Sequence, residues 1–289
     1  MKTVRKAVIP AAGFGTRFLP ISKAVPKEML PVLDRPVIQY VVEEAVASGI
    51  TDVLIVIGRS KRAIEEYFAP HRELEEELAG KGRADALAAC QAVSRMAKIH
   101  FVWQHEMRGL GDAVLHAREH VGDEPFALLM GDTIVEPAAG APPVTRQLCE
   151  VWERHGGSAI AVEEVPPDRV SQYGIIAGDE IAPGLIRART LVEKPKPEEA
   201  PGRLAVASRY VLSPRVFALL AGMPPGRNGE IQITDALARL AEEEPVFGWR
   251  FGGRRHDIGD KSGFVKTNIE FALRDPAIAG DVRRFLASL

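Results

Sequence analysis

The sequence predicts an α/β protein with a Rossmann-like mixed sheet, helices on both faces of that sheet and a smaller mixed β extension. Two observations predict this class. Residues 1–135 alternate short apolar runs with amphipathic helical stretches, which is the pattern of a parallel sheet. From residue 158 onward, four β-like runs follow one another with short turns, which is the pattern of mixed or antiparallel strands.

The spacing of apolar residues predicts the strands and helices of the first half of the chain. Near-continuous apolar runs indicate strands covered on both faces, and apolar stripes spaced by three and four residues indicate helices. Gly49 directly follows the first stripe, as is typical of a helix end. The expected strands are residues 4–9, 51–58, 99–104 and 126–130, and the expected helices are residues 36–50, 61–78, 83–98 and 111–121.

The second half places its strands before its helices. A last segment, residues 281–289, has an apolar edge that suits either its own core or a partner subunit. Since there is no internal repeat and no clear linker, we expect one domain over residues 1–289. The expected β runs are residues 158–165, 173–178, 186–195 and 204–212, and the expected helices are residues 213–221, 234–244 and 261–275.

Composition limits the class of partner. Lysine and arginine total 37 against 39 aspartate and glutamate residues, a formal charge of −2, which argues against nucleic acid as the main partner. Cys90 and Cys149 have no CxxC spacing and are expected to pack as small apolar side chains in a reducing compartment. The N-terminus lacks the apolar region of a signal peptide, and no stretch approaches the ~20 apolar residues of a membrane span. We therefore expect a cytoplasmic protein that does not bind membranes.

The loop after the first strand, "AAGFGTRFLPISKAVPKEMLPV" (residues 11–32), is the first candidate site. A dinucleotide fingerprint needs a third glycine where Phe18 stands, and a P-loop needs Gly-Lys-Ser/Thr where the sequence has "GTR". Two glycines one residue apart still allow backbone N–H groups to approach phosphate oxygens. Prolines kink the following chain and return Arg17 and Lys27 to the same strand end. Fixed cations beside a phosphate cradle favour phosphoryl transfer.

The segment "GFGTRFLPISKAVPKEMLPV" resembles the signature G-x-G-T-R-x-L-P-x-T-K-x-x-P-K-E-M-L-P of bacterial UTP–glucose-1-phosphate uridylyltransferases. These enzymes form a branch of the sugar-phosphate nucleotidyltransferase family. Ser22 stands where the signature has threonine. The resemblance continues in family order over nearly the whole chain, through "RPVIQYVVEEAVASGI", "GLGDAVLHA", "YGII", "VEKPKP", "SRYVLSP", "GEIQITDAL" and "HDIGDKSGF".

The resemblance implies that UTP and glucose 1-phosphate are the substrates, with Mg²⁺ as the cofactor. The nucleotide is expected on residues of about 1–135, and the sugar on about 136–289 together with the C-terminal helices. By resemblance, Lys27 lies near the α-phosphate, although a solvated lysine in a proline-rich loop is the alternative. The residues implied around the triphosphate are Gly13, Gly15, Thr16 and Arg17.

For the base, the resemblance implies Ala12, Gly13, Gln104 and Gly109. A glutamine amide both donates and accepts, which suits the imide edge of uracil. Gln104 could instead cap the end of its strand. Asp112 stands where the family has histidine, so the preferred base is less firmly implied than the reaction.

Asp132 is the first candidate metal ligand. It leaves the apolar run "FALLM" at the carboxyl edge of the predicted sheet, where a carboxylate can hold Mg²⁺ against phosphates. Related nucleotidyltransferases bring a later aspartate to the same ion, which makes Asp257 in "HDIGD" the second candidate. Capping of a local turn is the alternative for Asp257.

For the sugar phosphate, the resemblance implies Gly174, Glu193 and Lys194. A carboxylate can accept two hydrogen bonds from vicinal hydroxyls, and the ammonium can hold the phosphate. Neighbouring residues of a strand face opposite ways, so the strand must end or bend there, and Pro195 favours this. The run "LAVASRYVL" lacks a glycine that the resemblance implies near Ser208, a difference that could tighten or shift the sugar pocket.

One further motif is better explained without metal. "HAREH" (residues 116–120) matches the H-x-x-E-H zinc pattern, but His116 and His120 repeat on the helix side away from the apolar stripe. We expect a solvated polar face there.

Three functions remain open. They are UDP-glucose synthesis, the same chemistry with another nucleotide such as dTTP or another sugar 1-phosphate, and a catalytically silent regulator that binds nucleotide sugars. We favour the first and expect a homodimer or homotetramer, as in relatives. It requires Arg17, Lys27, Asp132 and Lys194 to converge around one reacting phosphorus.

Overall fold

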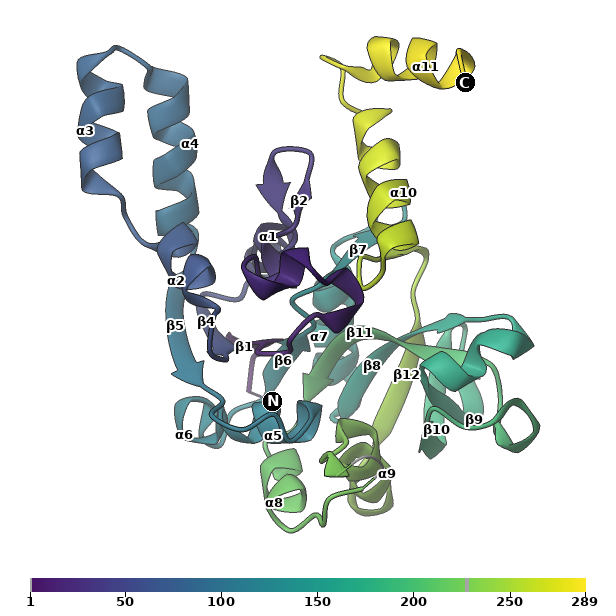
Figure 1. Cartoon of the computed structure of the whole chain (residues 1–289). Helices are drawn as coiled ribbons and strands as arrows, with labels where there is room; N and C mark the ends of the chain where they lie inside the picture. The colour runs from purple at the N-terminus through teal and green to yellow at the C-terminus, as the bar shows by residue number, and fades with distance from the viewer. Residues whose placement is uncertain (1, 227–228) are drawn as a thin grey trace.

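The computed structural model describes residues 2–226 and 229–289. Within these residues, nine strands form the main sheet in the spatial order β5-β4-β1-β6-β11-β8-β12-β10-β9 (Figure 1). Two small sheets, β13-β7 and β2-β3, accompany it. The strands are β1 (Lys6–Ala11), β2 (Pro31–Val32), β3 (Arg35–Pro36), β4 (Asp52–Ile57), β5 (Lys98–Trp103), β6 (Phe126–Leu129), β7 (Thr133–Pro137), β8 (Ser158–Glu164), β9 (Gly174–Ala182), β10 (Leu185–Glu193), β11 (Leu204–Leu212), β12 (Val246–Arg250) and β13 (Gly253–Asp257).

The α-helices cover both faces of this sheet and form two projections from it. Short 3₁₀ turns, η1 (Thr16–Phe18), η2 (Ile21–Lys23) and η3 (Lys27–Met29), build the loop after β1. The helices are α1 (Val37–Ala47), α2 (Arg62–Phe68), α3 (Arg72–Gly80), α4 (Ala84–Arg95), α5 (Leu110–Leu115), α6 (Arg118–Val121), α7 (Val144–His155), α8 (Arg215–Ala221), α9 (Ile233–Glu243), α10 (Lys261–Ala272) and α11 (Ala279–Ala287).

The sheet is mixed, as predicted. β5, β4, β1 and β6 are parallel neighbours, and β11 from the second half pairs antiparallel with β6. The four later β runs therefore continue the first sheet, with β9 and β10 as a hairpin at its far edge. Because parallel strands share one carboxyl edge, the loops that follow β1 and β6 lie together.

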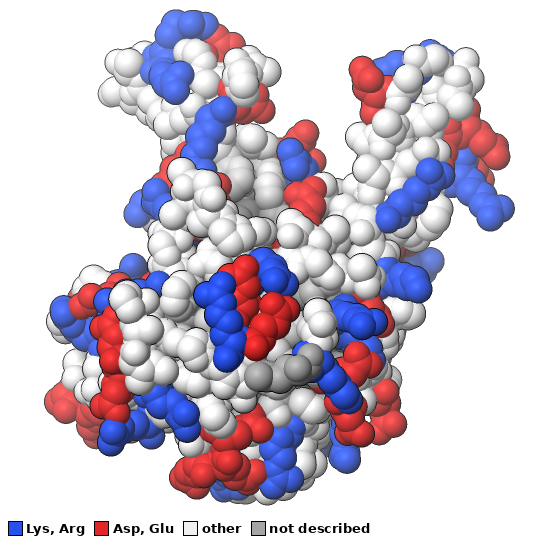
Figure 2. Space-filling view, turned by 180° about the vertical axis from the view of Figure 1, so that it is seen from behind, with Lys and Arg blue, Asp and Glu red and all other residues white. Residues whose placement is uncertain are grey.

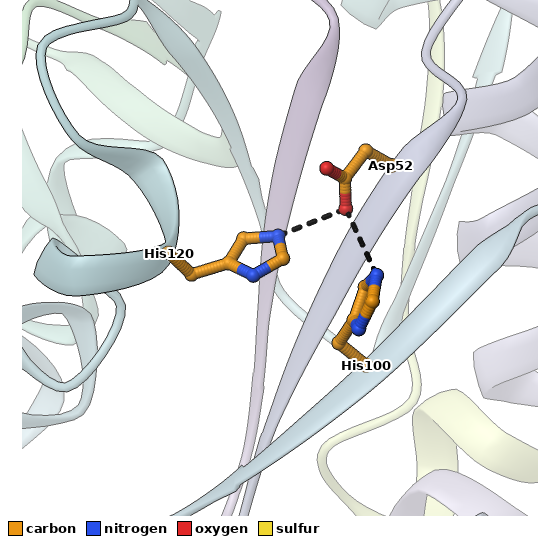
Figure 3. Close-up of side chains that lie close together, drawn as sticks. All are labelled: Asp52, His100 and His120. Atoms are coloured by element: carbon orange, nitrogen blue, oxygen red, sulfur yellow. Dashed lines mark hydrogen bonds and ion pairs between the residues drawn. The ribbon is translucent and has the colours of Figure 1, made fainter.

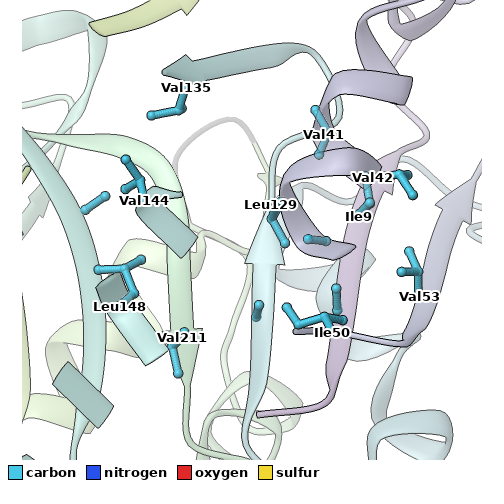
Figure 4. Close-up of a cluster of buried hydrophobic side chains, with 14 of the residues drawn as sticks. Ile9, Val41, Val42, Ile50, Val53, Leu129, Val135, Val144, Leu148 and Val211 are labelled. Atoms are coloured by element: carbon cyan, nitrogen blue, oxygen red, sulfur yellow. The ribbon is translucent and has the colours of Figure 1, made fainter. Parts of the chain in front are cut away.

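Alternating side chains divide the core into two layers. Ile9, Leu129 and Val211 point into the layer that α1 and α7 cover (Figure 4). Their chain neighbours on the same strands, such as Val8 and Leu128, point into the opposite layer, which α5, α8 and α9 cover. Both faces of the central strands are consequently dry, in keeping with their unbroken apolar runs.

Several predicted boundaries are wrong. β1 begins two residues later than expected and includes Pro10. The helix expected at residues 61–78 is broken into α2 and α3, because Pro70 disfavours helical backbone in the residue before it, and Ala69 is extended. The helix expected at 111–121 is interrupted by a turn between α5 and α6. The sequence analysis also missed α7 and the short strands β7, β12 and β13.

Two helical projections leave the body of the molecule (Figure 1). One is the hairpin of α3 and α4, and the other is the C-terminal pair α10 and α11. Figure 2 shows acidic and basic side chains interspersed over the rear face, in keeping with the small net charge. In the described part of the chain, no helix has the length and apolar character needed to cross a membrane.

Candidate active site

The loop after β1 folds back on itself and places Lys27 over its two glycines. Gly15 has φ +66°, a left-handed conformation that favours glycine. A Cβ at Gly15 would lie 3.2 Å from the Cβ of Lys27, and one at Gly13 would lie 3.8 Å from the Lys27 Nζ. The glycine spacing therefore gives the lysine stem room to cross the loop.

Lys27 meets Asp132 at the shared carboxyl edge of β1 and β6. The Lys27 Nζ donates a hydrogen bond of 2.5 Å to Asp132 Oδ2, although 105 residues separate the two. Burial opposes the charge on Lys27, but the carboxylates of Asp132 and Glu28 outweigh it and raise the pKa of Lys27. Burial likewise works against the charge of Asp132, yet Lys27 holds the pKa of that carboxyl below its ordinary value. Both groups are charged at neutral pH.

A second ion pair lies behind the first. Glu28 is almost fully buried, and its Oε2 accepts a 2.8 Å hydrogen bond from the buried Lys61. Its Oε1 has no hydrogen-bond partner within the described residues, and burial raises the pKa of Glu28 despite Lys61 and Lys27. The sequence analysis assigned no role to Glu28 or Lys61. Glu28 lies within the quoted signature, but nothing local indicates its pairing with Lys61.

Gln104 and Gly109 form the far wall of the site. Gln104 follows β5, and its Nε2 donates to Asp112 Oδ2 at 2.8 Å and to the Gly109 carbonyl at 3.3 Å. Gly109 has φ +101°, and a Cβ there would lie 2.8 Å from Glu230 Cβ. A side chain at position 109 would therefore separate this wall from the segment that carries Glu230.

These elements enclose a cavity of about 380 Å³, enough for part of a nucleotide. Eight of the predicted site residues line it, namely Ala12, Gly13, Gly15, Thr16, Lys27, Gln104, Gly109 and Asp132. Its lining also includes residues to which the sequence analysis gave no role, among them Phe14, Glu28, Met107, Leu110, Met130 and Glu230.

Asp257 lies beside this cavity, outside its lining. β13 pairs antiparallel with β7, and Asp257 stands opposite Thr133, the residue after Asp132. Asp257 Oδ1 accepts from the Gly259 amide at 3.0 Å, and Arg255 Nη1 lies 3.4 Å from Oδ2. The predicted turn cap is therefore present, and the same ladder brings Asp257 close to Asp132. Arg17 also reaches this turn, with Nη1 3.6 Å from where a Cβ on Gly259 would lie.

The residues predicted for the sugar form a separate group at the ends of β9 and β10. Gly174 pairs with Glu193, and Glu193 Oε2 accepts a 2.7 Å hydrogen bond from Thr234. β10 ends at Glu193, and Lys194 has φ +46°, so the predicted bend occurs there. The Lys194 Nζ lies 3.3 Å from Glu193 Oε1.

The expected convergence of four charged side chains is only partly observed. Lys27 and Asp132 line one cavity, whereas Arg17 and Lys194 do not. Arg17 is exposed in η1, two residues after the left-handed Gly15, and Lys194 follows the end of β10. The segment 230–234 connects the two groups, since Glu230 lines the cavity and Thr234 bonds to Glu193.

A buried ion pair supports the strand end that carries Asp132. Arg209 is fully buried and donates to Glu44 Oε2 at 2.8 Å and to the Thr133 carbonyl at 2.8 Å. Glu44 also accepts from the Thr145 hydroxyl at 2.7 Å. The sequence analysis missed this network, because Arg209 and Glu44 lie 165 residues apart.

The two histidines of "HAREH" contact different aspartates: His116 lies near Asp112, and His120 lies near Asp52. Figure 3 shows His100 and His120 turned toward Asp52, with His120 Nε2 2.8 Å from Asp52 Oδ1. His120 is therefore half-buried against Asp52, and the prediction of a wholly solvated face is wrong for it. The lysines Lys6 and Lys98 flank Asp52 in the parallel ladders, and Lys6 Nζ donates to the His120 carbonyl.

Comparison with known proteins identifies the class of protein to which this fold and cavity belong. The family model described as nucleotidyl transferase matches residues 6–272, so the chain belongs to the nucleotidyl transferase family.

The similar proteins point to one branch of that family. The chain is 49% identical over 288 residues to the UTP–glucose-1-phosphate uridylyltransferase of Streptococcus pneumoniae serotype 4, covering 99% of this chain and 96% of that protein. It is 47% identical to the enzyme of the same name from Staphylococcus epidermidis, over 100% of this chain and 99% of the relative. Among solved structures, the UTP-bound UGPase from Acinetobacter baumannii superposes with a TM-score of 0.91 at 38% identity, covering 99% of both chains. A UDP-glucose pyrophosphorylase complexed with UDP-glucose gives a TM-score of 0.87 at 38% identity, over 94% of this chain and 100% of that one.

Proposed function

We propose that this chain transfers the uridylyl group of UTP to glucose 1-phosphate and produces UDP-glucose and pyrophosphate. The phosphate oxygen of the sugar attacks the α-phosphorus of UTP, and the bond from that phosphorus to the oxygen bridging to the β-phosphate breaks. Pyrophosphate leaves with the electron pair, so no covalent enzyme intermediate is required. The Lys27–Asp132 pair inside a cavity walled by the glycine loop carries this proposal. Full-length identity to relatives of that name supports the choice of substrates.

Lys27 and Arg17 act on the phosphates in this proposal. The Lys27 ammonium lies inside the cavity and keeps its charge, so it can offset negative charge that builds up on the transferring phosphate. Gly13, Gly15 and Thr16 present loop backbone to the triphosphate. Arg17 is exposed and faces the turn after Asp257, where it can meet the outer phosphates.

The base is placed against Ala12, Gly13, Gln104 and Gly109. Ala12 follows β1 and Gln104 follows β5, and both are buried and line the cavity together with Gly109. The apolar side chains of Met107 and Leu110 in the lining suit the faces of an aromatic base.

Family members commonly use a divalent metal, and we propose Mg²⁺ on Asp132 and Asp257. The donor set fits this ion, since the two carboxylates lie at the same end of the β7–β13 ladder and Mg²⁺ prefers oxygen ligands. The buried Glu28 Oε1, which has no partner in the described structure, adds an acceptor near Lys27. When bound, the ion would neutralise phosphate charge and help to orient the triphosphate.

The sugar is placed on Gly174, Glu193 and Lys194. Glu193 is held by Thr234 of α9, which leaves its carboxylate oriented to accept hydrogen bonds from sugar hydroxyls. We therefore propose that residues of about 1–135 bind the nucleotide and residues of about 136–289 bind the sugar phosphate. The segment 230–234 joins the two sites.

We also propose a homodimer or homotetramer that acts in the cytoplasm, where UTP and sugar phosphates are available. The apolar edge of the last helix is solvent-exposed, which supports a partner subunit over the chain's own core. Phe285 is 62% exposed and Leu286 is 36% exposed. Light scattering of the purified chain measures the assembly directly.

One experiment tests the function. Pyrophosphate release is measured with Mg²⁺ for UTP, dTTP, CTP, ATP and GTP, each against glucose, galactose and N-acetylglucosamine 1-phosphates. We expect the highest kcat/KM for UTP with glucose 1-phosphate. A higher kcat/KM for another nucleotide and sugar 1-phosphate would make that pair the preferred substrates. Binding of UDP-glucose without pyrophosphate release from any substrate pair would indicate a catalytically silent regulator.

A further inference from the structure

Gln104 and Asp112 form a buried pair at the base side of the cavity. Gln104 is 3% exposed and Asp112 is 1% exposed. Asp112 is itself held in place, since Arg108 Nη2 lies 2.9 Å from its Oδ1 and His116 Nε2 lies 3.7 Å from its Oδ2. The carboxylate of Asp112 is therefore a fixed acceptor beside the Gln104 amide.

The carboxylate determines which way the Gln104 amide faces. A carboxylate only accepts hydrogen bonds, so the amide must turn its NH₂ group toward Asp112. The second N–H of Nε2 points to the Gly109 carbonyl at 3.3 Å, which is also an acceptor. Reversing the amide would set its carbonyl oxygen against two acceptors, and the observed orientation is thus the only one that both neighbours favour.

This orientation presents an acceptor to the ligand. With both N–H groups engaged, Gln104 Oε1 is the remaining polar atom of the side chain, and no donor among residues 2–226 and 229–289 hydrogen-bonds to it. Uracil carries an N–H at ring position 3 that can donate to such an oxygen. Cytosine carries an unprotonated ring nitrogen at that position, which is an acceptor. It would face Gln104 Oε1, a second acceptor, and both buried atoms would lack a hydrogen bond.

We propose that Asp112 is a positioning residue that makes the site selective for a base with an imide N–H. It acts through Gln104 and does not touch the base. The inference rests on the proposed function in one respect: it takes the wall formed by Gln104 and Gly109 as the site that binds the nucleotide base. It also accounts for the aspartate at a position where the sequence resemblance predicts histidine, because a neutral imidazole nitrogen can be either donor or acceptor and constrains the amide less.

The test compares UTP and CTP in Asp112→Asn. An asparagine in the same space can offer either an oxygen or an NH₂ group, so the Gln104 amide is free to reverse. We expect the preference for UTP over CTP in kcat/KM to fall at least tenfold, chiefly through KM, with kcat for UTP changed less than threefold. The exposed Asp123→Asn is the matched control and should keep the wild-type preference.

Calorimetric binding of UTP and CTP repeats the comparison without turnover, so the inference is testable even if uridylyl transfer fails. In a Gln104→Ala background, Asp112→Asn should change the UTP:CTP ratio no further, because the positioned group is gone. If Asp112→Asn does not fold, Gln104→Ala alone must lose the same discrimination. An unchanged ratio in either variant, or equal loss of both nucleotides, would overturn the proposal.

Discussion

Replacing Arg209 with methionine should destabilise the protein by about 3–5 kcal/mol, the usual effect of removing one partner from a buried ion pair. The side chain is fully buried and donates to Glu44 and to the carbonyls of Thr133 and Ser208. Without Arg209, the buried Glu44 carboxylate keeps its bonds from the Thr145 amide and hydroxyl and loses its cationic partner. The loss is a large share of a typical total stability of about 5–15 kcal/mol.

The double variant Glu44→Gln/Arg209→Met separates charge from packing. Removing both charges leaves no uncompensated carboxylate, so it should be more stable than Arg209→Met alone by about 1–2 kcal/mol. Urea unfolding followed by circular dichroism, at one protein concentration, measures each midpoint and slope. A loss below about 1 kcal/mol in Arg209→Met, or a double variant as unstable as the summed single variants, would refute the reasoning.

The remaining predictions concern the site and its surroundings. Lys27→Ala should lower kcat about 10²–10³-fold with little change in KM for UTP, because the ammonium acts on charge that develops during transfer. Asp132→Asn should abolish pyrophosphate release and keep the native circular dichroism spectrum. Burial raises the pKa of the Cys149 thiol to about 12, so a thiol reagent at pH 8 should label at most Cys90 in the folded chain and both cysteines after denaturation. Ser208 has φ +65°, so Ser208→Gly should stabilise the protein by up to about 1 kcal/mol in urea unfolding.

Each of these has a contrary outcome. A Lys27 effect confined to KM would mean that the lysine binds ground state and transition state equally. Normal turnover in Asp132→Asn would remove that residue from the site, with the exposed Asp123→Asn as its control. Two reactive thiols in the folded chain would contradict the burial of Cys149, and a less stable Ser208→Gly would mean that the serine side chain contributes more than the backbone strain removes.

Sequence reasoning works best where the signal is local. The glycine loop and the aspartate at a strand end were predicted because a turn, its cations and a strand terminus are readable from neighbouring residues. Lys27 and Asp132 do share a cavity. α7 had a readable signal as well, since Val144, Leu148 and Val151 follow helical spacing, but the sequence analysis did not use it.

The supporting charges could not be predicted in the same way. Glu28 pairs with Lys61, and Arg209 pairs with Glu44, only because the sheet brings distant segments together. The strand β13 reads as the polar run "GRRHD", without an apolar alternation, so the ladder that places Asp257 opposite Thr133 has no sequence signature. These contacts depend on how strands that are distant in the sequence pair with one another, and the composition of each segment does not reveal that pairing.

The position of β11 between β6 and β8 has a consequence for synthesis of the chain. β6 is an apolar strand, and its free edge is covered only when β11 emerges, about 80 residues later. At about 5–20 residues per second, a ribosome leaves that edge uncovered for roughly 4–16 s. An uncovered apolar edge is a template for pairing with other chains. Nascent chains paused in this window, and truncations ending near residue 135, should therefore depend on chaperones to stay soluble.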